Sequence, residues 1–187
     1  MKKFELTNEF ITNMFGTKLF RIRALVEFGD VEAGELGGYV EKESNLGHDD
    51  NAWVYGNARV CGDALVCDNA RVYGDAQVSG DARVYDNARV YGDAWVYGNA
   101  RVCGDALVCG DARVCGNGDY AYAHGFGSVN RTTTFFRLKD GGVGVRCGCF
   151  YGTLAQFRDK IRETHGETKK AQEYLMLADL MKLRFEK

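Results

Sequence analysis

A six-residue alternation of apolar and polar positions runs through the middle of the chain. From Ala52 to Asn117 the sequence repeats A-x-V-x-G-[DN] eleven times without an insertion, and only Asp68 and Asp86 replace the glycine. The alanine and valine of each repeat are two residues apart, so they point to one side of an extended segment and the x residues point to the other. Gly, Asn and Asp tolerate positive φ and supply a corner. The pattern predicts a short strand and a corner every six residues.

Such a ladder is typical of a solenoid, because each short strand can only bury its apolar side by stacking on its neighbours. It resembles the left-handed parallel β-helix of hexapeptide-repeat proteins, in which three hexapeptides form one triangular coil. The resemblance implies a prism of a little under four coils, with columns of valine and alanine inside. We therefore expect all eleven valines to be buried and the x residues, Arg71 and Arg89 among them, to point outward.

A longer repeat lies within the ladder. Residues 51–67 and 93–109 agree at sixteen of seventeen positions, at an offset of 42 residues. This offset equals seven hexapeptides, or two coils and one additional side of the triangle. The copy is therefore rotated by one face, which predicts that Trp53 and Trp95 lie on different faces. A duplication that moves the same residues to another face would not preserve a binding face built residue by residue. The duplication therefore favours a scaffold whose outer surface is generic.

The flanks of the ladder predict two caps. Residues 1–51 are expected to form a β hairpin and an irregular first coil, 52–131 the β-helix, and 132–187 a hairpin followed by two helices. Tyr120 and Phe126 continue the valine phase with larger side chains, as expected for residues that close the end of the prism. Thr153 begins the first helix with a capping box. The predicted fold class is mainly β: a left-handed parallel β-helix with an N-terminal β cap and a small C-terminal ββαα cap.

Composition narrows the possible settings. The chain has 24 Lys and Arg against 26 Asp and Glu, so it lacks the basic excess of proteins that grip double-stranded nucleic acid. No stretch reaches the roughly 18 to 20 apolar residues of a membrane span, and the N-terminus has no secretory pattern. The seven cysteines show no paired-ligand spacing and are interpreted as reduced thiols. These features predict a cytoplasmic protein without a membrane segment.

The outward positions of the ladder combine arginine with tyrosine. Arginine beside tyrosine suits stacking and the binding of phosphate or carboxylate, and it is also common at protein interfaces. A purely structural interpretation is that aromatic residues favour strands and arginine stems cover them. The candidate residues for binding a ligand or partner are Trp53, Tyr55, Arg71, Tyr73, Arg89, Tyr91, Arg83, Tyr85 and Arg101.

The layout as a whole is similar to a family of uncharacterised hexapeptide-repeat proteins of bacteria and their phages. The similarity rests on FGDVEAGELGGYVEKESNL, the hexapeptide ladder and CGCFYGTLAQFRDKIRETHG. Members are often labelled as transferases or polymer-forming proteins. The resemblance implies a fold and a habitat without a settled activity.

An enzymatic alternative follows from the fold, since many hexapeptide-repeat proteins are CoA-dependent acyltransferases. These act as trimers with a histidine base between prisms and usually have a loop that interrupts one coil. The present ladder has neither a histidine nor an interruption. His124, after the last coil, is the one candidate base, while His48 is expected in a solvated loop and His165 at a helix end. Cys147-Gly-Cys149 lacks further ligands, so no metal or cofactor is predicted.

The sequence thus predicts a non-enzymatic, oligomeric β-helix, most simply a homotrimer, with an Arg/Tyr surface. Tyr55, Tyr73 and Tyr91 form one column whose apolar surface calls for a partner. Ligands are expected in clefts between neighbouring prisms. In a phage setting, this surface suits capture of a host protein or sequestration of a small anionic nucleotide. The CoA-dependent acyltransferase remains the alternative.

Overall fold

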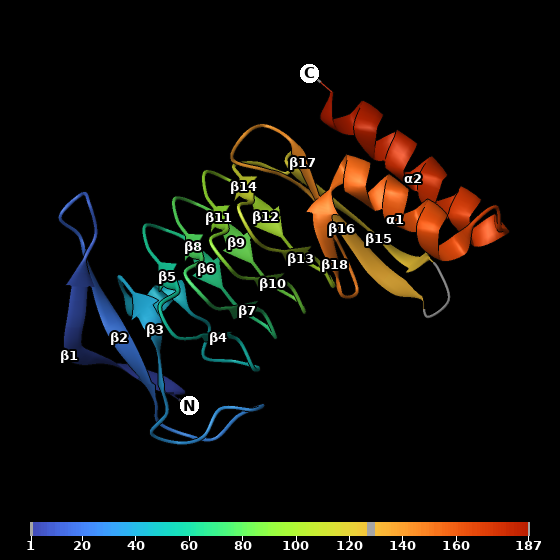
Figure 1. The fold of residues 1–187 in the computed structure, drawn as a ribbon. Helices are drawn as coiled ribbons and strands as arrows, with labels where there is room; N and C mark the ends of the chain where they lie inside the picture. The colour runs from blue at the N-terminus through green and yellow to red at the C-terminus, as the bar shows by residue number, and fades with distance from the viewer. Residues whose placement is uncertain (1, 127–129, 187) are drawn as a thin grey trace.

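A computed structural model describes residues 2–126 and 130–186 and shows a solenoid between two caps (Figure 1). The solenoid contains eleven strands of two residues that form three parallel sheets, here called faces A, B and C. Face A consists of β4 (Trp53–Val54), β7 (Arg71–Val72), β10 (Arg89–Val90) and β13 (Leu107–Val108). Face B contains β5 (Arg59–Val60), β8 (Gln77–Val78), β11 (Trp95–Val96) and β14 (Arg113–Val114). Face C contains β6 (Leu65–Val66), β9 (Arg83–Val84) and β12 (Arg101–Val102).

The register of the strands confirms the predicted coil. Val54 pairs with Val72, which pairs with Val90, so each strand lies on the strand 18 residues later. Backbone N–H groups of one coil donate to carbonyls of the next along the whole prism. Trp53 belongs to face A and Trp95 to face B, as the 42-residue offset predicts.

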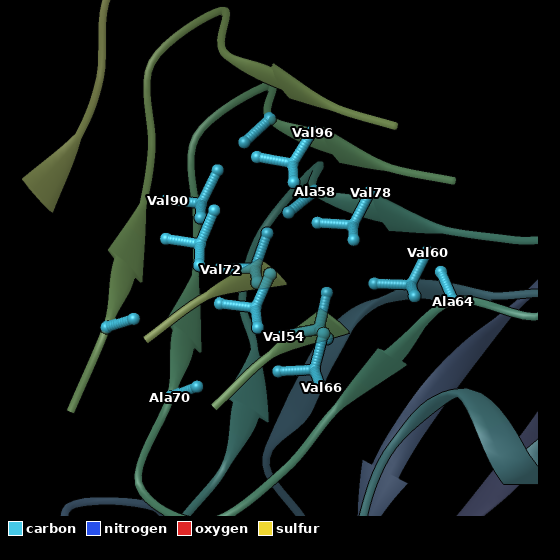
Figure 2. Packing of buried hydrophobic residues seen from close by; sticks show 14 of the residues in the cluster. Val54, Ala58, Val60, Ala64, Val66, Ala70, Val72, Val78, Val90 and Val96 are labelled. Carbon is cyan, nitrogen blue, oxygen red and sulfur yellow. The ribbon is translucent and has the colours of Figure 1, made fainter. Parts of the chain in front are cut away.

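The interior of the prism consists of valine and alanine columns. All eleven valines are fully buried, and every ladder alanine is at most 1 % exposed. Figure 2 shows these side chains converging from the three faces, with Val54, Val72 and Val90 in one column. Burial of each valine contributes about 1.5–3 kcal/mol, so the repeat itself supplies the driving force for the fold.

The corners show why the fifth position of the repeat is restricted. Asp68 and Asp86 have φ of 58° and 57°, like the glycines that occupy this place elsewhere, Gly116 in the last repeat excepted. A Cβ at Gly80 would lie 3.1 Å from the Gly98 nitrogen of the next coil. Glycine is therefore favoured both for its conformation and for the close stacking of corners, although Asp68 and Asp86 show that aspartate can occupy the place.

The N-terminal cap is a hairpin joined to an irregular coil. Its elements are β1 (Phe4–Thr12), β2 (Lys18–Ala24), β3 (Leu36–Val40) and the short 3-10 helix η1 (Glu43–Asn45). β3 runs parallel to β5, with Val40 opposite Val60, so this coil is two residues longer than the others. His48 is half-buried, stacks on Phe4 at 4.5 Å and accepts from the Lys3 amide. The prediction of a solvated His48 is wrong, because the hairpin packs on this loop.

The C-terminal cap is a four-stranded antiparallel sheet covered by two helices. Its elements are β15 (Tyr120–Phe126), β16 (Arg131–Arg137), β17 (Val143–Cys147), β18 (Phe150–Thr153), α1 (Leu154–His165) and α2 (Lys169–Phe185). Tyr120 is 8 % exposed and closes the solenoid core as predicted. Phe126 instead packs in the second core, because β15 leaves the hexapeptide pattern and pairs with β16. The cap therefore has two strands more than the predicted hairpin.

The cap covers the last coil directly. The Leu107 amide donates to Thr134 Oγ1 at 2.9 Å, and the Lys139 amide donates to the Asp111 carbonyl at 3.0 Å. Thr153 begins α1 through the predicted capping box with Gln156. Positions 127–129 of the predicted β-helix segment lie outside the described residues. Neither described helix is long and apolar enough to cross a membrane.

Candidate functional site on face A

Face A is covered at its first coil by the N-terminal cap. Trp53 is fully buried there, with its ring 6.2 Å from Phe4 and 5.3 Å from Phe28 in edge-on arrangements. The prediction that Trp53 belongs to an outer binding surface is wrong in this structure. The hexapeptide places the indole outward from the prism, but the hairpin and the following loop cover it.

The second coil of face A is tied to the same cap. Asp30 accepts hydrogen bonds from Tyr55 Oη at 3.0 Å and from Arg71 Nη1 at 2.8 Å. Burial raises the pKa of Tyr55 to about 12; the Arg71 charge opposes that shift, and Asp30 adds to it. Both candidates therefore have a partner within the chain. The repeat pattern gives no signal for Asp30, which lies outside the ladder.

The middle of face A carries two stacked tyrosines. The Tyr73 and Tyr91 rings are 4.8 Å apart and 2° from parallel. Both side chains are half-buried, and burial raises the pKa of each phenol. Their hydroxyls stay protonated at neutral pH, so the pair presents a neutral aromatic surface.

Arg89 lies beside this pair and borders a cleft. Along β10 the outward residues are Asn87, Arg89 and Tyr91, so Arg89 stands between the tyrosines and the Asn87 corner. A cleft of about 370 Å³ opens at that corner and is also lined by Asp105 and Arg131. Asn87 donates to Asp105 at 3.2 Å. Arg89 is exposed and forms no ion pair with any residue that the structure describes.

The C-terminal cap closes the far end of face A. Cys109 continues the tyrosine column but is only 2 % exposed. Burial raises the pKa of the Cys109 thiol, while the adjacent Arg146 charge lowers it. Arg146 comes from β17, and its charge also opposes the rise in the pKa of the Tyr73 and Tyr91 phenols. Sequence reasoning missed Arg146 and Arg131, because neither belongs to the repeat.

The remaining candidates form a separate group on face C. Arg83 and Arg101 lie opposite each other in neighbouring strands and are both exposed. The neighbouring Cys103 thiol raises the pKa of the Tyr85 phenol. Neither Arg83 nor Arg101 lines the face A cleft. The structure thus brings together Tyr73, Tyr91 and Arg89 and separates them from the face C residues.

His124 lies at the edge of the face A cleft. Its Nδ1 is 2.8 Å from Thr132 Oγ1, and Thr132 lines that cleft. The same nitrogen is 4.0 Å from Asp105 Oδ2, and the imidazole is exposed. His124 therefore has a hydroxyl and a carboxylate close to one ring nitrogen, an arrangement that suits a general base. It lies outside the hexapeptide ladder.

Thiols and carboxylates offer little for a metal. Cys147 is half-buried against Thr133 and Tyr174, whereas Cys149 is exposed in the turn after β17. The two thiols of Cys147-Gly-Cys149 therefore lie in different environments. Within residues 2–126 and 130–186, no group of three or more His, Cys, Asp or Glu side chains could hold a metal ion.

Comparison with known families agrees with the coil geometry. A family model described as the YdcK beta solenoid repeat matches five overlapping stretches, 64–80, 76–92, 82–98, 94–110 and 100–116. The chain is a β-solenoid repeat protein. The matched stretches span faces A, B and C of the prism and leave both caps outside. No curated protein matches the chain.

The arrangement on face A suits recognition of an anion that carries a flat ring. Stacked tyrosines provide a surface for a ring, and an arginine without a carboxylate partner provides bidentate donors for phosphate or carboxylate. Arginine and aromatic contacts together are the usual means by which proteins bind unpaired nucleobases and their phosphates.

Proposed function

We propose that this β-solenoid protein is a non-enzymatic binding protein that sequesters a small anionic ligand with an aromatic ring, such as a nucleotide, on face A. The observation that carries the proposal is the Tyr73–Tyr91 stack beside Arg89, at the edge of a cleft of about 370 Å³. The ring of the ligand packs against the exposed edges of the tyrosine pair in an edge-to-face arrangement. Its anionic group binds Arg89, with Arg131 on the other side of the cleft.

The dimensions of the site favour a small ligand over a host protein. The tyrosine column is covered at Tyr55 by the N-terminal cap and at Cys109 by the C-terminal cap. These two rows are three coils apart, which corresponds to about 14 Å. An opening of this width accommodates a nucleotide or the narrow corner of a neighbouring prism, whereas the two caps hold off a broad host-protein surface.

Self-association is the second part of the proposal. Of the arginines on the faces of the prism, only Arg71 forms an ion pair among the described residues. The corners carry Asp and Asn ladders, such as Asn87 with Asp105. A face of one prism and a corner of another are therefore complementary in charge. We infer a homo-oligomer, in the simplest case a trimer, in which a neighbouring copy completes the face A cleft.

Native mass spectrometry of protein purified from the cells that produce it tests both parts together. We expect an oligomer that retains a molecule of nucleotide mass. Arg89→Gln should weaken binding of added nucleotide by about tenfold, which corresponds to about 1.4 kcal/mol. Arg59→Gln, on face B, is the matched control and should bind as the wild type does. A nucleotide that binds both variants equally would refute the face A site.

A second candidate function rests on His124. Its contacts with Thr132 and Asp105 at the face A cleft fit a general base, as an acyltransferase would need. A CoA-dependent acyltransferase would place its thioester in this cleft. Against this function, the ladder lacks the interrupting loop and the internal histidine that the fold's acyltransferases use.

The resemblance and the cysteines support a proposal for where the protein acts. All seven cysteines are free. Free thiols are typical of proteins in a reducing compartment, and we propose a cytoplasmic location in a bacterial or phage-infected cell. Sequestration of a nucleotide signal would be a useful activity for a phage-encoded protein there.

A further inference from the structure

A second cleft lies on face B, where the last coil meets the C-terminal cap. It has a volume of about 590 Å³ and is lined by residues of the solenoid, of the β16–β17 connection and of the end of α2. Three cationic side chains line it, from Arg113, Arg137 and Lys139. Asp119 is the one carboxylate in the lining that the structure describes.

Arg113 is held in place by neutral partners. Its guanidinium lies 4.6 Å from the centre of the Trp95 ring. Its Nη1 donates to the carbonyls of Ala112 at 2.8 Å and Asp93 at 2.9 Å. These contacts fix the orientation of the group, and none of them supplies a negative charge.

Arg137 is fixed in the same manner from the other wall. Its Nη1 donates to the Gly141 carbonyl at 3.0 Å, and its Nη2 donates to the Phe185 carbonyl at 2.9 Å. The guanidinium also lies 5.1 Å from the centre of the Phe185 ring. Neither Arg137 nor Arg113 forms an ion pair with a described residue.

The single carboxylate of the cleft is already engaged. Asp119 Oδ2 accepts hydrogen bonds from the amides of Cys115 at 2.9 Å and Gly116 at 3.1 Å. It therefore serves the turn after the last coil. Lys139 also borders a neighbouring cavity that contains Asp111 and Asp140. Arg113 and Arg137 are therefore the fixed cations of the cleft, without an ion pair among the described residues.

We propose that this face B cleft binds the phosphate group of a phosphorylated small molecule. Arg113 and Arg137 have planar donor groups that suit phosphate oxygens, and Lys139 adds a mobile third donor. Tyr97 is 36 % exposed in the lining and offers an aromatic wall for the organic part of the ligand. The site shares no lining residue with the face A cleft, and it stands whether or not face A binds a ligand.

Tryptophan fluorescence offers a readout specific to this cleft. The chain has two tryptophans, of which Trp53 is fully buried under the N-terminal cap. Trp95 is 37 % exposed and in contact with Arg113, so a ligand at the cleft should change its emission. Adenosine monophosphate, inorganic phosphate and adenosine are the three probes, titrated into the full chain with Arg89→Gln to weaken the face A site.

The expected result is saturable binding of adenosine monophosphate and of inorganic phosphate, and none of adenosine. Lys139→Gln should weaken phosphate binding about 5- to 10-fold, and Arg137→Gln about 10- to 100-fold. Lys139 is exposed, so its replacement leaves the fold intact even if Arg137→Gln loosens α2. Arg59→Gln is the matched control, because Arg59 lies in the same column three coils from Arg113.

Three outcomes would overturn the inference. Adenosine that binds as tightly as its monophosphate would show that phosphate is not recognised. If Arg59→Gln weakened phosphate binding as much as Lys139→Gln, the binding would depend on the overall charge of the protein and not on this cleft. Loss of all phosphate binding on introduction of Arg89→Gln alone would locate the anion on face A, which would leave the proposed function standing and this site refuted.

Discussion

The pH dependence of stability should reveal the buried Lys3 of the N-terminal cap. Lys3 is 3 % exposed, and its Nζ donates to the Ala52 carbonyl at 2.9 Å and lies 4.6 Å from the centre of the Phe28 ring. Burial lowers the pKa of this amine to about 8 from 10.5, while the charges of Asp50 and Asp49 oppose the shift. Folding therefore buries this ammonium at an electrostatic cost.

The sign of the effect follows from proton binding. Between pH 8 and 10.5 the unfolded chain holds a proton on Lys3 that the folded chain has released, so the free energy of unfolding rises with pH in this window. Each unit of pKa difference corresponds to about 1.4 kcal/mol. Between pH 7 and pH 9.5, Lys3 should add about 2 kcal/mol to stability.

Urea denaturation followed by circular dichroism measures this term. Lys3→Met should lack the gain of about 2 kcal/mol on going from pH 7 to pH 9.5 that the wild type shows. Cysteines and tyrosines that titrate in the same range are common to both proteins, so their contributions cancel in the difference. Lys2→Met is the control, because Lys2 is exposed and pairs with Glu43 at the surface. Identical pH dependence of Lys3→Met and wild type would refute the argument.

Three further predictions concern the coil, the assembly and the enzymatic alternative. In urea denaturation, Gly80→Ala should lower the free energy of unfolding by about 2 kcal/mol and Gly56→Ala by about 1 kcal/mol. Both glycines have positive φ, but of the two only Gly80 contacts the next coil. Equal losses would contradict the stacking argument. Replacing Tyr73 and Tyr91 together with Ser should reduce the oligomer size seen by light scattering and leave the circular dichroism spectrum unchanged, and a monomeric wild type would refute the assembly. If the protein is a CoA-dependent acyltransferase, it should bind CoA and His124→Ala should abolish acyl transfer. Absence of any binding heat in calorimetry at millimolar CoA would exclude this alternative.

The repeat made the solenoid predictable in detail. Period, face assignment and the inward direction of the valines follow from residue spacing alone, because each hexapeptide depends only on its nearest neighbours. The helix that begins at Thr153 was equally readable, since its capping box is a local signal. These features share the property that a few consecutive residues determine them.

The caps were less predictable because their contacts connect distant parts of the chain. Trp53 has the same sequence environment as Trp95, yet one is fully buried and the other is 37 % exposed. The difference comes from Phe4 and Phe28, which no pattern near Trp53 announces. The same reason applies to the face A site: Tyr73, Tyr91 and Arg89 were found from the ladder, whereas Arg131 and Arg146 reach it from the C-terminal sheet.

Because the prism has three faces, the number of hexapeptides determines the rotation of one cap relative to the other about the prism axis. Asp30 of one cap and Arg146 of the other both reach face A, so the two caps overhang the same side. Removing one whole coil would bring them closer by about 4.8 Å over that side. Removing a single hexapeptide would swing one cap by a third of a turn and separate the two walls of the site. Only insertions or deletions of whole coils, that is of multiples of three hexapeptides, therefore keep both caps on face A and preserve a cleft between them.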